Sequence, residues 1–486
     1  MTLRISVLSN FVRTSAQAAA AAGILAGTVS LLSAASLTSS PPANGLQAAQ
    51  RPAQLDLSME GRGNAQILGI AGFTAPAGDQ ELADALHLVA SVLWDDIDFE
   101  HEYRQVSREA AAMVSTPASG PVPGTWVALG ADLVLTGVAR RVGQHLEVDV
   151  TVMAVTGSSA GEPVFGRRYR NCTLENPRAC AHFIADDFHK AMTGLDGVAQ
   201  ARLAFVSTRD ALRLAGRPVA EPGVSKEVYF ADYDGANPRR ITANRHLNIA
   251  PAWSPDGRSL AYTSWESGFQ DIYVIHPFAG GPRSRLAAGS DHQHNELAEW
   301  SPDGTRLVFS STDSRGYRDV VVVNRDGSGR RNLTPNTPTW DDGAPTWSPN
   351  GQQIAFTSNR SGTNQIYTMS ADGTLVTRLT FGAHSDAPAW SSRGYIAFAL
   401  QTSSAGQDIA VYVFQTQEVR VLTDGIGSYG SPSVAPNGRH IALTATRWGQ
   451  EQIATIDYPT GTNLRRVTFE GANSYPSWSL TPGVQR

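Results

Sequence analysis

The fold is decided by Trp253-Ser254-Pro255-Asp256-Gly257, because this stretch returns along the chain at a nearly constant interval. Its copies begin at Trp300, Trp347, Trp390, Val434 and Trp478, so the successive spacings are 47, 47, 43, 44 and 44 residues. A period in the forties, with several short strands in each unit, is typical of a β-propeller.

One repeat unit, residues 353–390, shows the expected blade. Residues 354–358 and 365–369 alternate like half-buried strands, Asp372-Gly373 suits a tight hairpin, and residues 377–380 form a further strand. The Ser-Pro-Asp-Gly part of the motif predicts a type I turn, since Pro presets φ and Gly closes the turn. We expect the tryptophan before it to pack between neighbouring blades as a structural residue.

The number of blades follows from the strands at the two ends of the repeat region. Residues 202–206, 227–231 and 239–242 are three strands without a tryptophan strand, whereas Tyr475-Pro476-Ser477-Trp478 is a tryptophan strand without followers. Pairing them closes a ring of six blades and leaves no free sheet edge. The predicted fold class is therefore an α/β N-terminal domain plus an all-β six-bladed β-propeller.

The chain divides into three predicted parts: a signal peptide and low-complexity segment (1–48), an α/β domain (54–197) and the propeller (198–486). Arg4 and Arg13 precede a charge-free run over residues 14–50 that contains an apolar stretch. This pattern predicts a secretory signal, cleaved after Ala34 or Ala35 or at a later site near Ala48. The alternative is an uncleaved membrane anchor, which the many Ser, Gly and Ala residues disfavour.

In the α/β domain, residues 66–73, 132–139, 145–155 and 164–169 are predicted strands, and Asp79 caps a predicted helix. A second helix is expected over residues 181–192, ended by Gly194. Cys172 and Cys180 lie between a strand and this helix, so export predicts a disulfide, with two free thiols as the alternative.

The composition and motifs favour no catalytic chemistry. The net charge of −5 argues against general nucleic-acid binding. Gly157-Ser158-Ser159-Ala160-Gly161 has the spacing of a nucleophile elbow, but it falls in a predicted hairpin turn. His292 with His294 is weak evidence for a metal site, and Asp341, Asp342 and Asp386 fit screened surface carboxylates better than a cation site. We expect no catalytic residue, no metal and no cofactor.

The loops before the tryptophan strands are the predicted functional surface, because in every blade they come nearest the central channel. Polar and aromatic loop residues on a rigid scaffold suit recognition of a partner. For any single residue, simple solvation or turn capping is the alternative, whereas the set favours a binding rim. The residues are Asn248, His294, Glu296, Asp341, Asp342, Asp386, Tyr429, Asn473 and Tyr475.

The N-terminal domain carries a resemblance to a known family. The segments 126–137, 155–157, 182–187 and 192–197, which lead into residues 202–206, resemble those of the TolB family of Gram-negative bacteria. The resemblance runs from about Leu55 to the C-terminus. It implies a monomeric, non-enzymatic periplasmic protein of the Tol–Pal system, with no nucleic-acid partner, that serves outer-membrane integrity and constriction during cell division.

The resemblance also implies partners and sites. The lipoprotein Pal would dock at the mouth of the propeller channel, the inner-membrane protein TolA would contact the chain, and other outer-membrane lipoproteins are further candidate partners. His294-Asn295 resembles the family's histidine–asparagine pair. Gly343, after Asp341-Asp342, departs from the family, which more often has a hydroxyl residue there. The N-terminal switch segment would comprise Gln54, Leu55, Asp56 and Leu57.

Two other functions stay open at this point. One is a propeller hydrolase or the regulatory half of a serine peptidase, which the repeats running to the end of the sequence disfavour. The other is an exported propeller that senses a glycan or a peptide without Tol partners.

Overall fold

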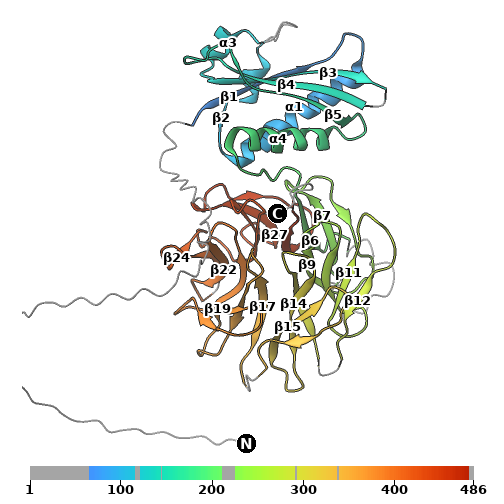
Figure 1. The fold of residues 1–486 in the computed structure, drawn as a ribbon, viewed down its shortest axis with the longest axis vertical. Helices are drawn as coiled ribbons and strands as arrows, with labels where there is room; N and C mark the ends of the chain where they lie inside the picture. The colour runs from blue at the N-terminus through green and yellow to red at the C-terminus, as the bar shows by residue number, and fades with distance from the viewer. Residues whose placement is uncertain are drawn as a thin grey trace, which may run out of the picture. The chain divides into compact units, whose positions relative to one another are not determined.

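The computed structural model describes residues 65–114, 121–143, 145–210, 225–290, 293–335, 339–404 and 406–480 (Figure 1). The predicted signal segment (1–48) and the predicted switch residues Gln54, Leu55, Asp56 and Leu57 lie outside these ranges. Among the described residues, no helix is both long enough and apolar enough to cross a membrane.

The N-terminal part is a five-stranded mixed sheet in the order β2-β1-β3-β4-β5. Its strands are β1 (Ile67–Thr74), β2 (Arg104–Gln105), β3 (Leu133–Val142), β4 (His145–Ala154) and β5 (Pro163–Thr173). The long helices α1 (Gln80–Glu100) and α4 (Pro177–Thr193) cover one face, and α3 (Pro123–Ala128) lies on the other (Figure 1). The short α2 (Arg108–Ala112) follows β2.

Local chemistry sets the limits of the two long helices. The Asp79 cap and the Gly194 end are those predicted, whereas α4 begins at Pro177, four residues before the predicted start at 181. The Asp79 carboxylate accepts a hydrogen bond from the Leu82 N–H at 3.1 Å and caps α1. Gly194 ends α4 with φ of 76°, a left-handed conformation that costs glycine little. The apolar sides of both helices join one core with β1, β3, β4 and β5. The segment Gly157–Gly161 lies in the turn between the antiparallel strands β4 and β5.

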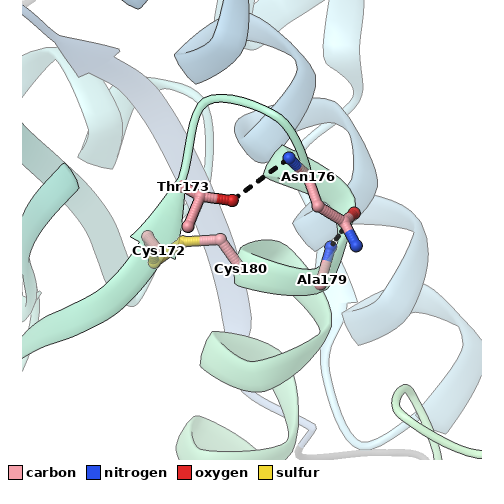
Figure 2. Close-up of a disulfide and its surroundings, with 5 residues drawn as sticks. All are labelled: Cys172, Thr173, Asn176, Ala179 and Cys180. Atoms are coloured by element: carbon pink, nitrogen blue, oxygen red, sulfur yellow. Dashed lines mark hydrogen bonds between the residues drawn. A yellow bond between two sulfur atoms is a disulfide. The ribbon is translucent and has the colours of Figure 1, made fainter. Parts of the chain in front are cut away.

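A disulfide between Cys172 and Cys180 ties the end of β5 to the first turn of α4 (Figure 2). Both cysteines are buried. In the loop between them, the Asn176 N–H donates to Thr173 Oγ1 at 3.3 Å, and Asn176 Oδ1 accepts from the Ala179 N–H at 3.1 Å (Figure 2). The bridge and the helix cap therefore fix the same strand-to-helix corner.

The C-terminal part is a ring of six four-stranded sheets, numbered here as blades 1 to 6. From the innermost strand outward, blade 1 comprises β9 (Asn248–Trp253), β10 (Leu260–Ser264), β11 (Asp271–Ile275) and β12 (Ser284–Ala287), and blade 2 comprises β13 (Asn295–Trp300), β14 (Arg306–Thr312), β15 (Arg318–Asn324) and β16 (Arg331–Asn332). Blade 3 comprises β17 (Asp342–Trp347), β18 (Gln353–Ser358), β19 (Gln365–Ser370) and β20 (Thr377–Arg378), and blade 4 comprises β21 (Ser385–Trp390), β22 (Tyr395–Gln401), β23 (Gln407–Val413) and β24 (Glu418–Val421). Blade 5 comprises β25 (Tyr429–Val434), β26 (His440–Ala445), β27 (Gln452–Asp457) and β28 (Arg465–Arg466), and blade 6 comprises β29 (Asn473–Trp478), β6 (Arg202–Ser207), β7 (Glu227–Asp232) and β8 (Arg239–Arg240).

Blade 6 closes the ring with strands from both ends of the repeat region. The last strand, β29, pairs antiparallel with β6, with Asn473 opposite Ser207 and Trp478 opposite Leu203. The six-bladed propeller predicted from the sequence is confirmed.

The repeated turn has the predicted geometry. In its first copy the Gly257 N–H donates to Ser254 O at 2.8 Å, and the Asp256 carboxylate accepts from the Arg258 N–H at 3.0 Å. The tryptophan before the turn packs between blades: Trp300 is 4% exposed, and its indole N–H donates to Ala252 O of the preceding blade at 3.2 Å. These tryptophans are structural, as predicted.

The most divergent copy of the repeat contacts the α/β domain. Glu100 ends α1 and is buried, and it accepts hydrogen bonds from the Val198 N–H at 2.9 Å, from Asn437 Nδ2 at 3.3 Å and from His440 Nε2 at 3.3 Å. Burial alone would raise the pKa of Glu100, but the hydrogen bond from His440 and the nearby charges of His189, His440 and Arg439 lower it to about 2. Asn437 donates to Glu100 from the turn position that holds Asp256 and Asp303 in two other copies of the repeat.

We expect removal of the disulfide to destabilise the fold. Replacing both Cys172 and Cys180 by Ala should lower the free energy of unfolding by about 2–3 kcal/mol, because the bridge closes an eight-residue loop in the unfolded chain. Chemical denaturation of both proteins measures the difference. Dithiothreitol should produce a similar loss in the natural chain and none in the double variant. An unchanged unfolding midpoint in the double variant would contradict the stabilising role.

Candidate functional site

The innermost strands of the six blades surround a central channel with a cavity of about 590 Å³. These strands are β9, β13, β17, β21, β25 and β29, and each carries a bulge where its pairing register with the next strand shifts. At each bulge, a residue other than glycine has a positive φ, and the six are Ala250, Leu297, Ala344, Ala387, Ser431 and Tyr475. Because bulges re-aim side chains, this repeated distortion sets what faces the channel.

The first residue of each inner strand is buried, and this group includes several predicted contact residues. Asn248, Asn295, Asp342 and Asn473 are each 0% exposed, and Tyr429 is 1% exposed. Burial keeps these side chains away from the channel mouth. Gly343 is also buried, and a Cβ there would lie 3.2 Å from Ser310 Oγ.

Hydrogen bonds explain this burial. Asn248 Nδ2 donates to Lys226 O at 2.7 Å, Asn295 Nδ2 to Ala288 O at 3.0 Å, and Asn473 Nδ2 to Glu470 O at 3.0 Å. The Asp342 carboxylate pairs with Arg360 at 2.8 Å, and the Tyr429 hydroxyl donates to Asp424 at 2.7 Å. These buried polar side chains at the start of the inner strands therefore hold the adjoining loops in place.

Three of the predicted side chains, Glu296, Asp386 and Tyr475, do line the channel. They come from blades 2, 4 and 6, and their strands begin at the same end of the ring. The pKa of the Tyr475 hydroxyl is raised first by burial and then by the carboxylates of Glu296, Glu451 and Asp386. The half-buried phenol of Tyr475 thus lies near several carboxylates at the mouth of the channel.

Asp341 and His294 lie in the loops at this mouth. Arg318 also lines the channel, and its guanidinium lies 3.7 Å from Glu296 and 3.6 Å from Asp341. The backbone N–H of His294 donates to Thr312 Oγ1 at 2.7 Å, and its ring Nδ1 is buried without a hydrogen-bond partner in the described part of the chain. Among the side chains that line the opening, the carboxylates of Glu296 and Asp386 outnumber the guanidinium of Arg318, so we infer an acidic opening.

The sequence reasoning missed Arg318 and Glu299. Glu299 lies on the channel wall, deeper than Glu296 on the same strand, and accepts hydrogen bonds from Thr346 Oγ1 at 2.9 Å and from the Trp347 N–H at 3.4 Å. Burial raises the pKa of Glu299 to about 7, and these two bonds only partly oppose it. An alignment of the repeats would identify Glu299, because the residue at this position is uncharged in every other blade. Those residues are Ala252, Thr346, Ala389, Ser433 and Ser477.

The described residues contain no group of three or more His, Cys, Asp or Glu side chains placed to hold a metal ion. His292, which the sequence paired with His294, lies outside the described ranges. The mouth therefore offers charge, a phenol and fixed loops, which is chemistry suited to binding a partner.

Replacing Glu299 by Gln should stabilise the protein in a pH-dependent way. The pKa of Glu299 in the folded chain, about 7, lies above the ordinary value of 4.5. Between pH 4.5 and pH 7, Glu299 therefore keeps its proton in the folded chain and loses it in the unfolded chain. The natural protein therefore loses stability over this range. Gln accepts the same hydrogen bonds without this loss, so we expect a gain of about 1–2 kcal/mol at pH 8 and almost none at pH 4.

Urea unfolding at the two pH values measures this effect. The same substitution at Glu418, an exposed residue of β24, controls for the loss of one negative charge. An equal gain at both pH values, or a loss at pH 8, would contradict the raised pKa.

Comparison with known proteins gives concordant results. Residues 189–481 match the family described as TolB beta propeller domain. The Tol-Pal system protein TolB of Desulfosudis oleivorans is 30% identical over 210 residues, which cover 42% of this chain and 44% of that protein. The TolB of Roseobacter denitrificans is 32% identical over 213 residues, with the same two coverages of 42% and 44%. The chain thus spans about half the length of the curated relatives it matches.

The crystal structure of TolB from Acinetobacter baumannii has the same fold. It superposes with a TM-score of 0.71 at 21% identity, covering 86% of this chain and 97% of that one. Since the family match covers more than half of the sequence, the chain belongs to the TolB β-propeller family.

Proposed function

We propose that this protein is a periplasmic, non-enzymatic scaffold of a Tol–Pal system, which binds the lipoprotein Pal at the mouth of its propeller channel. In this role it links outer-membrane integrity and constriction during division to the inner-membrane Tol complex. Membership of the TolB β-propeller family supports the system, because the matched relatives are Tol-Pal system proteins. The acidic mouth supports the site.

The observation that carries the proposal is the set of side chains that the bulged inner strands aim into one opening. Glu296, Asp386 and Tyr475 come from separate blades and are held on a closed ring rather than on mobile loops. A rigid surface loses little conformational entropy when a partner binds. Its carboxylates favour a partner segment that carries positive charge. His294 and Asp341 extend this site, and the buried Asn248, Asn295, Asp342, Gly343, Tyr429 and Asn473 position its loops.

The compartment and the second partner belong to the same proposal. Residues 1–48 are proposed to direct export to the periplasm, and a disulfide between Cys172 and Cys180 suits an oxidising compartment. The segment with Gln54, Leu55, Asp56 and Leu57 is proposed to connect the chain to TolA. It stands at the start of the proposed α/β domain (54–197), which precedes the propeller (198–486). We propose a monomer that needs no cofactor and has no nucleic-acid partner.

The test is binding of purified Pal to the full chain and to a mouth variant with Glu296→Gln and Asp386→Asn. Two lost charge interactions of about 1 kcal/mol each should weaken binding roughly 10- to 30-fold. The variant should also show a smaller salt dependence, because fewer charges take part. Isothermal titration calorimetry at low and high salt measures both effects.

The control is Glu418→Gln combined with Asp84→Asn, which removes the same charges from exposed positions on β24 and α1. This control should bind Pal like the natural chain. Unchanged binding by the mouth variant would overturn the site, and no binding by the natural chain would overturn the partner.

A further inference from the structure

We propose that docking extends beyond the channel onto an outer arc of exposed apolar side chains, and that the occupant is a folded domain seated across the mouth. The arc consists of Trp340, Phe381, Ile426 and Phe469. This inference rests on the proposed function, since it places a partner at the same end of the ring, and it adds the size and the charge pattern that the partner must have.

The four residues lie in the corresponding loops of successive blades, and Phe381 and Phe469 occupy the same position within their loops. Each follows the outermost strand of a blade and precedes the innermost strand of the next one, after β16, β20, β24 and β28. Because all these inner strands begin at the channel mouth, the four side chains lie at the end of the ring that carries Glu296 and Asp386. Their exposed fractions are 36%, 74%, 56% and 69% for Trp340, Phe381, Ile426 and Phe469. Large apolar groups with this exposure around one rim indicate an interaction surface.

Arginines hold the aromatic rings of the arc in place. The Arg378 guanidinium stacks on Phe381 at 4.5 Å from the ring centroid and donates from Nε to Thr380 O at 2.7 Å. Arg466 repeats this arrangement in blade 5, at 4.8 Å from Phe469 and 2.7 Å from Thr468 O. A ring that is already fixed loses little freedom when it is buried by a partner.

Trp340 is held in a related way. Arg360 lies 5.2 Å from the Trp340 ring and is itself fixed by the buried Asp342 carboxylate at 2.8 Å. Asp342 thus fixes Arg360, which in turn contacts the Trp340 ring.

The channel opening and the two stacked aromatic rings of the arc differ in the charges beside them. The channel opening is acidic, with Glu296, Asp341 and Asp386, whereas Arg378 and Arg466 form no ion pair with a carboxylate within the described residues. A complementary partner has a basic centre surrounded by apolar and acidic side chains. A peptide threaded into the channel would contact the acidic centre alone, so the pattern favours a folded domain.

The arc is also one-sided. The loop over residues 241–247, which follows β8, has no exposed large apolar side chain. We therefore expect the partner to lie over the side formed by blades 2 to 5.

The experiment compares Phe381→Ser with Phe469→Ser in one chain against Leu375→Ser. Leu375 is 80% exposed but lies in the hairpin at the opposite end of blade 3, so it is a matched control for loss of an exposed apolar side chain. The probe is purified Pal, measured by calorimetry on the full chain. Loss of two aromatic anchors should weaken binding about 100-fold, and the control should stay within about twofold.

A second arm separates this inference from the proposed function. A photo-crosslinking residue at 381 or 469, and at 375 as control, is irradiated in cells, and the product is identified by mass spectrometry. A product with Pal from 381 and 469 supports both proposals. A product with another folded protein that has the stated charge pattern supports the arc and overturns Pal as the partner. No product from either position, or Pal binding that the double substitution leaves unchanged, overturns the arc.

Discussion

The pairing of β29 with β6 is the interaction on which the rest of the propeller depends. It joins the last strand of the repeat region to the first, so blade 6 exists only when both ends of the chain segment meet. Closure removes the free sheet edges and fixes the width of the channel that six inner strands enclose. The bulges of those strands then place Glu296, Asp386 and Tyr475 at one opening, so the geometry of the mouth is a property of the whole ring.

The two ends of the ring make different contacts within the chain. At one end, the turn with Asn437 and the start of β26 contact Glu100 of α1, which holds the α/β domain. At the other end, where the inner strands begin, buried polar residues such as Asn295 hold the loops. The half-exposed carboxylates and the arc of apolar side chains take no part in the contact with the α/β domain. Because these contacts lie at opposite ends, the proposed docking does not compete with the α/β domain.

The fold could be predicted from the sequence because its determinants are local and repeated. The spacing of the tryptophan motif, the Asp79 cap and the Gly194 terminus each depend on neighbours in the chain. The candidate site could be predicted only as a set of loops. Whether a residue such as Asn248 or Glu296 faces the channel depends on the bulge in its own strand. The positive φ of these two bulges falls on Ala250 and Leu297, which carry no sequence signal for a turn. The raised pKa of Glu299 and the role of Asn437 arise from contacts with another blade or with α1.

The most direct test of a partner at the channel mouth is hydrogen–deuterium exchange of the full chain with and without purified Pal. We predict slower exchange of backbone amides at the mouth, in residues 294–297, 385–387 and 474–476, with unchanged exchange in the turns at the other end, 254–257 and 301–304. Slower exchange confined to those turns or to the α/β sheet would contradict it.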